Sequence, residues 1–378
     1  MERLARFQRR KGSDSLRSDN GFAMNSTTDS TADRARPRIA VIGYGWWGRD
    51  CHCRLIRLAE GLELYGVATN DPAKLDAIRS GQNCRAFPSY DAAFNDPDVD
   101  AVVLATPSHA HADLAVRALA AGKHVVTDKA MCLTLADCDR MIAASERTGR
   151  LLTVFQNRRL DDDFRTLQAC MTDGRVGDVR WLETSWQGFG AWGGWRGQAA
   201  LGGGRFYDLG AHLVDQIALL FPERITGVFC RMPHDFAESD VDSECLIVVD
   251  FEGGRTAVCD LSSRCAFPKP RFCAHGTRAT YVQYGIDPQE AALMAGNIDV
   301  AQPDPAHGAR LKGEGAEEEV RRVPGRWRDF YENLADVLTR GALPLVKLPE
   351  ARRAIGILDA ARRSAETGAR IPVDFGPA

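Results

Sequence analysis

The sequence lacks a long hydrophobic run, a strong excess of charge of either sign, and paired cysteine motifs. No stretch of its 378 residues approaches the roughly twenty consecutive apolar residues that span a bilayer. The formal net charge of -3 gives no basic surface of the kind that binds nucleic acid. The length corresponds to about two domains of roughly 150 residues each. We therefore expect a globular chain with neither a membrane nor a nucleic-acid partner.

The 11 cysteines are scattered without C-x-x-C pairs, which indicates small buried residues in a reducing compartment. Among them are Cys51, Cys53, Cys132, Cys245 and Cys259. Residues 1–36 are rich in Arg, Ser, Asp and Thr without hydrophobic periodicity, which predicts a disordered N-terminal extension. No apolar segment follows Arg9-Arg10, as a twin-arginine export signal would require, so we expect a cytoplasmic protein.

A glycine-rich run follows the first apolar stretch, Ile-Ala-Val-Ile at 39–42. Its members are Gly43, Tyr44, Gly45, Trp46, Trp47 and Gly48. Such glycines allow a sharp turn off a strand and let a pyrophosphate approach the N–H groups at the start of the next helix. The spacing of Leu55, Leu58 and Ala59 predicts that helix. The run therefore predicts a dinucleotide-binding site.

Short apolar strands alternate with helices over residues 37–156. The predicted strands are 38–42, 62–69, 101–105, 124–127 and 151–155. Asp71-Pro72 predicts a helix start, and Thr134 with Asp137 predicts a capping box. The alternation indicates a Rossmann domain with a doubly wound parallel sheet.

Successive strands with tight turns follow in the second half of the chain. The predicted strands are 179–186, 225–232, 244–251, 255–262, 271–275 and 279–284. Residues 285–325 are predicted to form a long polar connection, followed by helices at 326–340 and 349–367 and a short strand at 371–374. We expect 157–378 to be an α+β domain for substrate binding and oligomerisation. It would have a large, mostly antiparallel sheet and C-terminal helices able to pack back on the Rossmann domain.

Four motifs follow one another from residue 37 onward. They are the glycine run at 43–48, Ala105-Thr106-Pro107 with His109 and His111, Ala121-Gly122-Lys123-His124-Val125 leading to Asp128-Lys129, and the segment 202–212 with Asp208 and His212. Together they resemble the Gfo/Idh/MocA family of oxidoreductases. The family's usual Glu-Lys-Pro is Asp128-Lys129-Ala130 here, without the restriction that proline imposes.

The resemblance implies an NAD(P)-dependent dehydrogenase. Such an enzyme transfers a hydride between nicotinamide and a secondary hydroxyl or ketone of a cyclitol or sugar. The resemblance also implies that Lys129, Asp208 and His212 form the catalytic trio and that no metal takes part. The sequence itself offers no set of three or four Cys, His or carboxylate residues at metal-ligand spacing.

These three residue types suit acid-base chemistry. Lys129 follows a predicted strand at the carboxyl edge of the sheet, where open α/β folds bind ligands, and it can stabilise an alkoxide. Asp208 and His212 share one face of the helix predicted over 208–221. Histidine can accept the hydroxyl proton, and a nearby carboxylate can orient the histidine or the substrate and favour the charged imidazole. The glycines at 202–204 would let the start of this helix approach a ligand.

The choice of cofactor depends on the end of the second predicted strand. A carboxylate there would accept from the ribose 2′-hydroxyl and indicate NAD, but this chain has Thr69 and Asn70. We expect Asp71 to cap the next helix and Lys74 to approach a 2′-phosphate, so we favour NADP. NAD stays open, because a shift of one residue would bring Asp71 to the ribose. We assign to the same cofactor site Thr106, Pro107, His111, Lys129, Trp195 and Arg196.

Tryptophans and hydrogen-bond donors indicate a polyhydroxylated substrate, since tryptophan faces can cover C–H surfaces while Arg and Asn bind hydroxyls. We assign to the substrate site Asn157, Arg158, Trp192, Asp208 and His212. Trp181 and Trp186 are expected in the core or an interface. The run Asn157-Arg158-Arg159 with Asp161 and Asp163-Phe164 resembles the NADP-dependent scyllo-inositol dehydrogenase branch.

Two further interpretations remain. Some relatives bind cofactor or sugar without turnover, so the alternative function is a nucleotide- or sugar-sensing regulator. The open face of the second sheet is also expected to pair subunits into a homodimer or homotetramer.

Overall fold

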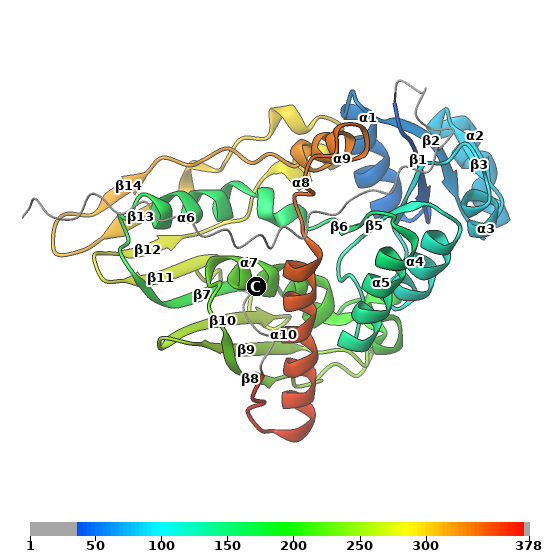
Figure 1. The fold of residues 1–378 in the computed structure, drawn as a ribbon. Helices are drawn as coiled ribbons and strands as arrows, with labels where there is room; N and C mark the ends of the chain where they lie inside the picture. Colours follow the sequence, from blue (N-terminus) through cyan, green and yellow to red (C-terminus); the bar gives the residue numbers. More distant parts are fainter. Residues whose placement is uncertain (1–35, 374–378) are drawn as a thin grey trace, which may run out of the picture.

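The computed structural model describes residues 36–373, and all statements below concern this part of the chain. The predicted N-terminal extension, apart from Arg36, lies outside the described residues. Figure 1 shows two sheets side by side, with the helix Leu348–Thr367 (α10) running between them.

The first sheet is a parallel Rossmann sheet with the strand order β3-β2-β1-β4-β5-β6. Its strands are β1 Arg38–Ile42, β2 Glu63–Ala68, β3 Arg85–Phe87, β4 Ala101–Leu104, β5 His124–Thr127 and β6 Leu152–Val154. The predicted fold class is confirmed, and five of these strands agree with prediction to within one residue at each end. The prediction missed β3, because a strand of three residues is too short to show a readable alternation.

Helices cover this sheet, and some helical segments begin at residues whose side chains cap the first turn. The helices are α1 Cys53–Leu58, α2 Leu75–Gln82, α3 Tyr90–Phe94, α4 His111–Ala120 and α5 Leu135–Thr148. The Asp71 carboxylate accepts from the N–H of Ala73 at 3.0 Å, and the Thr134 hydroxyl accepts from the N–H of Asp137 at 3.1 Å. Both predicted helix starts are therefore confirmed.

The second sheet has the order β14-β13-β12-β11-β7-β10-β9-β8. Its strands are β7 Val179–Gln187, β8 Ile225–Arg231, β9 Glu244–Phe251, β10 Arg255–Ser262, β11 Phe272–Gly276, β12 Thr280–Gln283, β13 Ala309–Lys312 and β14 Glu318–Val320. It is mostly antiparallel, as predicted, although β7 pairs in parallel with β10. Buried and more exposed residues alternate along β9 and β10, so one face packs on helices and the other faces outward.

The prediction of a connection without regular structure over 285–325 was wrong. This segment contains the helix Gln289–Met294 (α8) and the edge strands β13 and β14. The two strands are short and carry mostly charged residues, which is common at sheet edges and gives a weak sequence signal. The strand predicted at 371–374 is a single bridge between Ile371 and Val228, and Asp374 lies outside the described residues.

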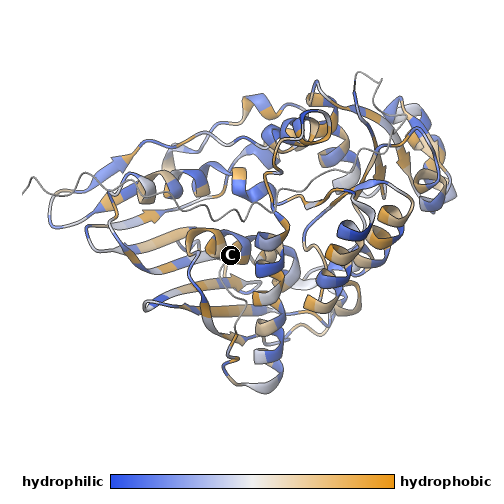
Figure 2. Cartoon of the chain, viewed as in Figure 1, coloured by the Kyte–Doolittle hydropathy of each residue, from blue (hydrophilic) through white to orange (hydrophobic). Residues whose placement is uncertain are grey.

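Four helices pack against the second sheet or join it to the Rossmann domain. They are α6 Asp162–Thr172, α7 Ala211–Leu220, α9 Arg328–Arg340 and α10. α10 contacts β8 and α7 on one side and α5 on the other, while α9 contacts α1. Figure 2 shows hydrophobic residues concentrated along the strands of both sheets, as expected for sheets that supply the core. None of the described helices combines the length and apolar character that crossing a membrane requires.

Candidate active site

Two adjoining cavities lie where the Rossmann domain meets the second domain. The glycine-loop cavity, of about 610 Å³, is lined by the glycine run and by the ends of β2, β4 and β5. The Lys129 cavity, of about 480 Å³, contains Lys129, Asp208 and His212. Six residues line both cavities, namely Trp46, Trp47, Thr106, Asp128, Trp195 and Arg196. A ligand of the first cavity can therefore meet a ligand of the second.

Each of the three glycines in the run is needed for a different steric reason. A Cβ at Gly43, which has φ +106°, would lie 2.5 Å from the Ala105 carbonyl oxygen, and one at Gly48 would lie 2.5 Å from the Gly43 carbonyl oxygen. A Cβ at Gly45 would meet nothing within 4 Å, and Gly45 lines the cavity. Gly43 and Gly48 thus allow the loop to pack, while Gly45 leaves space for a ligand. Gly48 does not itself line the cavity, contrary to expectation.

The polar residues that follow β2 at one end of the glycine-loop cavity already form hydrogen bonds within the protein. The Asp71 carboxylate caps its helix and lies 3.4 Å from Lys74 Nζ. The Thr69 hydroxyl accepts from the N–H of Asp71 at 3.1 Å, and the Asn70 side-chain oxygen accepts from the N–H of Tyr90 at 3.3 Å. These residues line the cavity, as do Tyr44 and Pro107. The Lys74 ammonium is 47% exposed and is the cationic group at this end.

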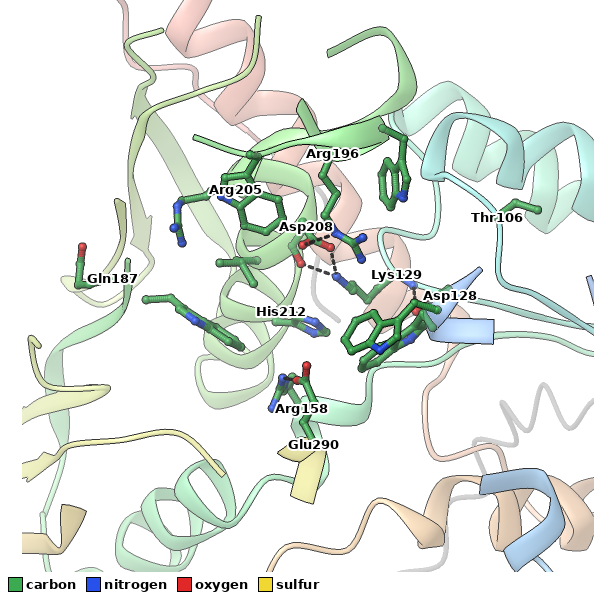
Figure 3. Close-up of a pocket in the computed structure, with 16 residues that line it drawn as sticks. Thr106, Asp128, Lys129, Arg158, Gln187, Arg196, Arg205, Asp208, His212 and Glu290 are labelled. Carbon is green, nitrogen blue, oxygen red and sulfur yellow. Dashed lines mark hydrogen bonds and ion pairs between the residues drawn. The ribbon is translucent and has the colours of Figure 1, made fainter. Parts of the chain in front are cut away.

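Lys129 follows β5 and points into the second cavity (Figure 3). Its Nζ donates to the Asp208 carbonyl oxygen at 2.6 Å and to Asp208 Oδ1 at 2.5 Å. An ammonium has three N–H donors, and the third has no acceptor among the described residues. The side chain is 9% exposed, so this donor is largely shielded from bulk solvent within the cavity. The Lys129-Ala130 peptide bond is cis.

The Asp208 carboxylate binds two cations. Its second oxygen accepts from Arg196 Nε at 3.1 Å. Burial alone would raise the pKa of Asp208, but Lys129 and Arg196 hold it below its usual value through their charges and hydrogen bonds. Asp208 is therefore ionised and keeps Lys129 in place.

His212 lies in the same cavity but is not hydrogen-bonded to Asp208. Of the two expected roles of this carboxylate, orienting the imidazole was therefore wrong, and orienting the substrate stays a prediction. Asp208 lies in a π-helical turn, Phe206–Gly210, that precedes α7, and its oxygens face Lys129 and Arg196. Among the described residues His212 Nδ1 has no partner, and the ring stacks on Trp186 at 6.4 Å between centroids.

The pKa of His212 is shifted opposite to expectation. Burial, followed by the positive charges of Lys129, Arg158 and Arg271, holds this pKa well below its usual value. The imidazole is therefore neutral at pH 7. A neutral imidazole is the form that can accept a proton.

The glycines at 202–204 do not open the helix start to a ligand. A Cβ at Gly204 would collide with the Asp242 carboxylate, which accepts from the N–H of Phe206 at 3.1 Å. A Cβ at Gly203 would meet the carbonyl oxygens of Arg196 and Gln198. The turn is therefore glycine-rich because protein atoms lie where side chains would point, and at Gly204 buried Asp242 occupies that place.

Two other assigned residues lie outside the cavities. His111 is fully buried, with Nδ1 2.8 Å from the Ala130 carbonyl oxygen and Nε2 2.9 Å from that of Thr106. It joins the two cavity-lining loops rather than contacting the cavities. Asn157 is also buried, and both its side-chain polar atoms lack a partner among the described residues.

Arg158 and the tryptophans form the wall facing Lys129. The Arg158 guanidinium lies 4.9 Å from the Trp186 ring and 5.0 Å from the Trp327 ring, and it bonds Asp161 at 3.2 Å as well as Glu290. Trp192 and Trp195 line the cavity as expected. Trp186 also lines it, contrary to expectation, whereas Trp181 is 38% exposed on the outer face of the sheet.

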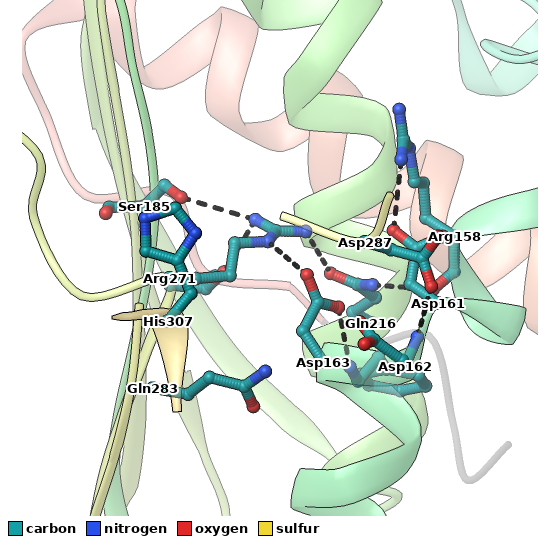
Figure 4. Close-up of polar contacts among 12 residues, drawn as sticks. Arg158, Asp161, Asp162, Asp163, Ser185, Gln216, Arg271, Gln283, Asp287 and His307 are labelled. Atoms are coloured by element: carbon teal, nitrogen blue, oxygen red, sulfur yellow. Dashed lines mark hydrogen bonds and ion pairs between the residues drawn. The ribbon is translucent and has the colours of Figure 1, made fainter. Parts of the chain in front are cut away.

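A buried polar layer supports this wall from behind (Figure 4). Arg271 donates to Gln216 at 3.0 Å and to the Ser185 carbonyl oxygen at 3.3 Å. Burial and the neighbouring Asp287 raise the pKa of Asp162 to about 7. The layer places several charges behind Arg158, where a hydrophobic core would otherwise lie.

Sequence reasoning missed four polar residues of the Lys129 cavity, besides the apolar Leu209. The four polar residues are Asp128, Gln187, Arg205 and Glu290. Asp128 was visible beside Lys129 in its motif, and Arg205 was visible after the three glycines. Glu290 stands in the helix that was predicted to be a connection, and Gln187 ends a strand without a motif. Among the described residues no group of three or more His, Cys, Asp or Glu could hold a metal ion.

Comparisons with known proteins agree with this geometry. Residues 37–156 match the model of an oxidoreductase family with an NAD-binding Rossmann fold, and residues 164–282 match the GFO/IDH/MocA C-terminal domain. The uncharacterized oxidoreductase YdgJ of Escherichia coli K12 is 33% identical over 312 residues, which cover 80% of this chain and 88% of that protein. The fold and the cavities thus define an oxidoreductase with an NAD-binding Rossmann domain. The chain belongs to the Gfo/Idh/MocA family, as its motifs predicted.

Two further relatives extend the comparison. The scyllo-inositol 2-dehydrogenase (NADP(+)) IolW of Bacillus subtilis is 26% identical over 344 residues, covering 87% of this chain and 94% of IolW. A candidate oxidoreductase of known structure from Klebsiella pneumoniae has a TM-score of 0.80 at 30% identity, covering 90% of this chain and 96% of that one. The likeness extends over both domains in each case.

Proposed function

We propose that this protein is an NADP-dependent dehydrogenase. It oxidises a secondary hydroxyl of a cyclitol or sugar to a ketone, or catalyses the reverse reaction, without a metal. The observation that carries the proposal is the free third donor of Lys129. This donor lies in the Lys129 cavity, which adjoins the glycine-loop cavity and also contains the neutral His212.

In oxidation, Lys129 Nζ donates to the substrate oxygen and stabilises the negative charge that develops there. His212 accepts the hydroxyl proton as a neutral base. Asp208 holds Lys129 and Arg196 and stays ionised. A nicotinamide dinucleotide in the glycine-loop cavity would supply the hydride acceptor. The hydroxyl carbon thus loses a hydride and its oxygen loses a proton.

The residues of the glycine-loop cavity fit such a cofactor. Gly45 leaves open space beside the backbone at the start of the helical segment, where a pyrophosphate would be held. We propose NADP rather than NAD because Asp71 caps a helix and Lys74 supplies a positive charge at the same end. The relative IolW, which is named as NADP-dependent, supports this choice.

The substrate class follows from the second cavity. Its volume of about 480 Å³ suits a small molecule, and its lining alternates tryptophan faces with charged donors and acceptors. This lining fits a polyhydroxylated ring, which has apolar C–H surfaces and polar edges. The inositol dehydrogenases among the relatives support the same class.

The test is a spectrophotometric screen of the purified full chain. Inositols and aldoses are offered with NADP and NAD, and their keto forms with NADPH and NADH, and the absorbance of the reduced nicotinamide is followed. We expect turnover with at least one polyol and a preference for NADP(H). If the chain binds NADPH but turns over no member of the panel, the non-catalytic regulator becomes the better assignment.

We further propose that two copies pair through the outward face of the second sheet. This face exposes Trp181 and Leu246, each 38% accessible. Light scattering after size exclusion would show a dimer or a larger even-numbered assembly. A monomer at micromolar concentration would contradict the proposal.

A further inference from the structure

One end of the Lys129 cavity carries a fixed guanidinium that the proposed chemistry does not use. Arg205 lines the cavity and is 6% exposed. Its Nε donates to the Ser263 hydroxyl, and its Cζ lies 5.3 Å from the centre of the Trp192 ring. A Cβ at Gly188 would come within 2.5 Å of Nη2, so the guanidinium packs directly on the Gly188 backbone. These contacts fix its position.

The terminal nitrogens of Arg205 have no acceptor among the described residues, and no carboxylate there forms an ion pair with it. The other cations that line the cavity are paired, Lys129 and Arg196 with Asp208 and Arg158 with Glu290. The charges of Asp242 and Asp208 reach Arg205, but Asp242 is bonded to the N–H of Phe206 and Asp208 to Lys129 and Arg196. A buried charge without a partner is costly. Arg205 thus carries a positive charge with no directly bonded carboxylate among the described residues, and its terminal N–H donors are free there.

We propose that Arg205 is a specificity-determining residue that binds an anionic group of the substrate, either a carboxylate or a phosphate. The guanidinium fork offers parallel N–H donors that match such groups. Figure 3 shows Asp208 between Lys129 and Arg205, so the anionic group lies away from the reacting carbon. The inference rests on the proposed polyol dehydrogenase activity and narrows it to acidic polyols, namely sugar acids or sugar phosphates.

The test compares matched neutral and acidic polyols. Glucose, glucuronate and glucose 6-phosphate form one set, galactose with its uronate and 6-phosphate a second, and myo-inositol with its 1-phosphate a third. We expect the wild type to favour an acidic member over its neutral counterpart by at least tenfold in kcat/KM. Whether the uronate or the phosphate is favoured identifies the anionic group.

The Arg205→Gln variant should remove this preference. Loss of a charge-assisted hydrogen bond predicts a fall of about 10- to 100-fold in kcat/KM for the acidic substrate, with the neutral one changed less than about twofold. Arg310→Gln, at an exposed position of β13 outside both cavities, is the matched control and should change neither. Equal turnover of neutral and acidic members by the wild type, or an equal fall for both in Arg205→Gln, would overturn the proposal.

A second variant covers the case in which Arg205→Gln fails to fold. Gly188→Ala keeps the arginine but displaces its flexible end, so it should lower the preference several-fold. If the wild type turns over no polyol at all, the proposed dehydrogenase function fails, but this result does not decide whether Arg205 binds an anion. The anion site is then tested by tryptophan-fluorescence titration of the full chain with glucuronate and with glucose 6-phosphate. Binding that is lost in Arg205→Gln would support the site, and unchanged or absent binding would refute it.

Discussion

The two cavities are built in different ways. The glycine-loop cavity is formed by consecutive strand ends and by a loop whose shape follows from where a Cβ cannot fit, as at Gly43 and Gly48. The Lys129 cavity is formed by side chains from segments far apart in the sequence, held by ion pairs such as Lys129 with Asp208 and Arg158 with Glu290. The first therefore depends on backbone sterics and the second on charge pairing.

This difference predicts which property a substitution in each cavity would change. A change in the glycine loop acts through packing, so it should affect cofactor affinity and stability. A change among the paired charges leaves a buried partner unsatisfied and acts on turnover.

Replacing His212 by Asn should have the largest effect on catalysis. Asn keeps approximate size and some hydrogen bonding but cannot accept the proton, so the oxidation rate should fall by about 100- to 10,000-fold. Because the pKa of His212 lies well below its usual value, the wild-type rate should stay constant as the pH falls from 7 to about 6.5. It should decline only at lower pH, and pH–rate profiles of both proteins check this.

Thermal unfolding gives an independent control on the same substitution. Between the lowered pKa and about 6.5, the unfolded chain binds a proton at His212 that the folded chain does not, so His212 makes the protein less stable as the pH falls. The melting temperature of His212→Asn relative to wild type should therefore rise from pH 7 to pH 5. An unchanged rate and pH profile would reduce His212 to a residue that orients the substrate.

Lys129→Met should lower turnover by about 100- to 1,000-fold, since a donor aimed at the developing oxyanion is lost while much of the stem volume stays. NADPH affinity, measured by fluorescence titration, should change little. Near-normal activity would remove Lys129 from the mechanism. Lys347→Met, at the exposed start of α10, is the matched control.

The sequence was sufficient to predict the parallel sheet, the glycine loop and the presence of Lys129, Asp208 and His212 in one cavity. The first two follow from a short motif or a local period, and the third also needed the resemblance to the family. The pairing of Asp208 with Lys129 and Arg196, the position of His111 behind the loops and the role of Asp242 at the helix start were not predictable. They depend on which distant group satisfies each buried charge or N–H, and one segment's sequence does not contain that information.

Gly48→Ala and Gly45→Ala should distinguish a glycine needed for packing of the loop from a glycine that leaves space for the cofactor. The Gly48 Cβ would meet a backbone carbonyl that cannot move freely, so we expect a loss of about 1–3 kcal/mol in unfolding free energy. At Gly45 the Cβ enters the open cavity, so stability should hold within about 0.5 kcal/mol while NADPH affinity falls about tenfold. Denaturant unfolding and NADPH titration check both. Equal stability of the two variants would contradict the steric account.

Lys74→Ala should have the smallest effect and concerns the choice of cofactor. The Lys74 side chain is 47% exposed and forms an ion pair with Asp71. Its attraction for a 2′-phosphate should therefore be as weak as that of a surface ion pair, about two- to fivefold in affinity. NADPH binding should weaken by this factor while NADH binding stays the same, and the difference should shrink as salt is raised. Arg79→Ala, in the following helix and outside the cavity lining, is the control. If NADH binds the wild type at least as tightly as NADPH, the carboxylate of Asp71 serves the ribose, and the helix-capping argument for NADP fails.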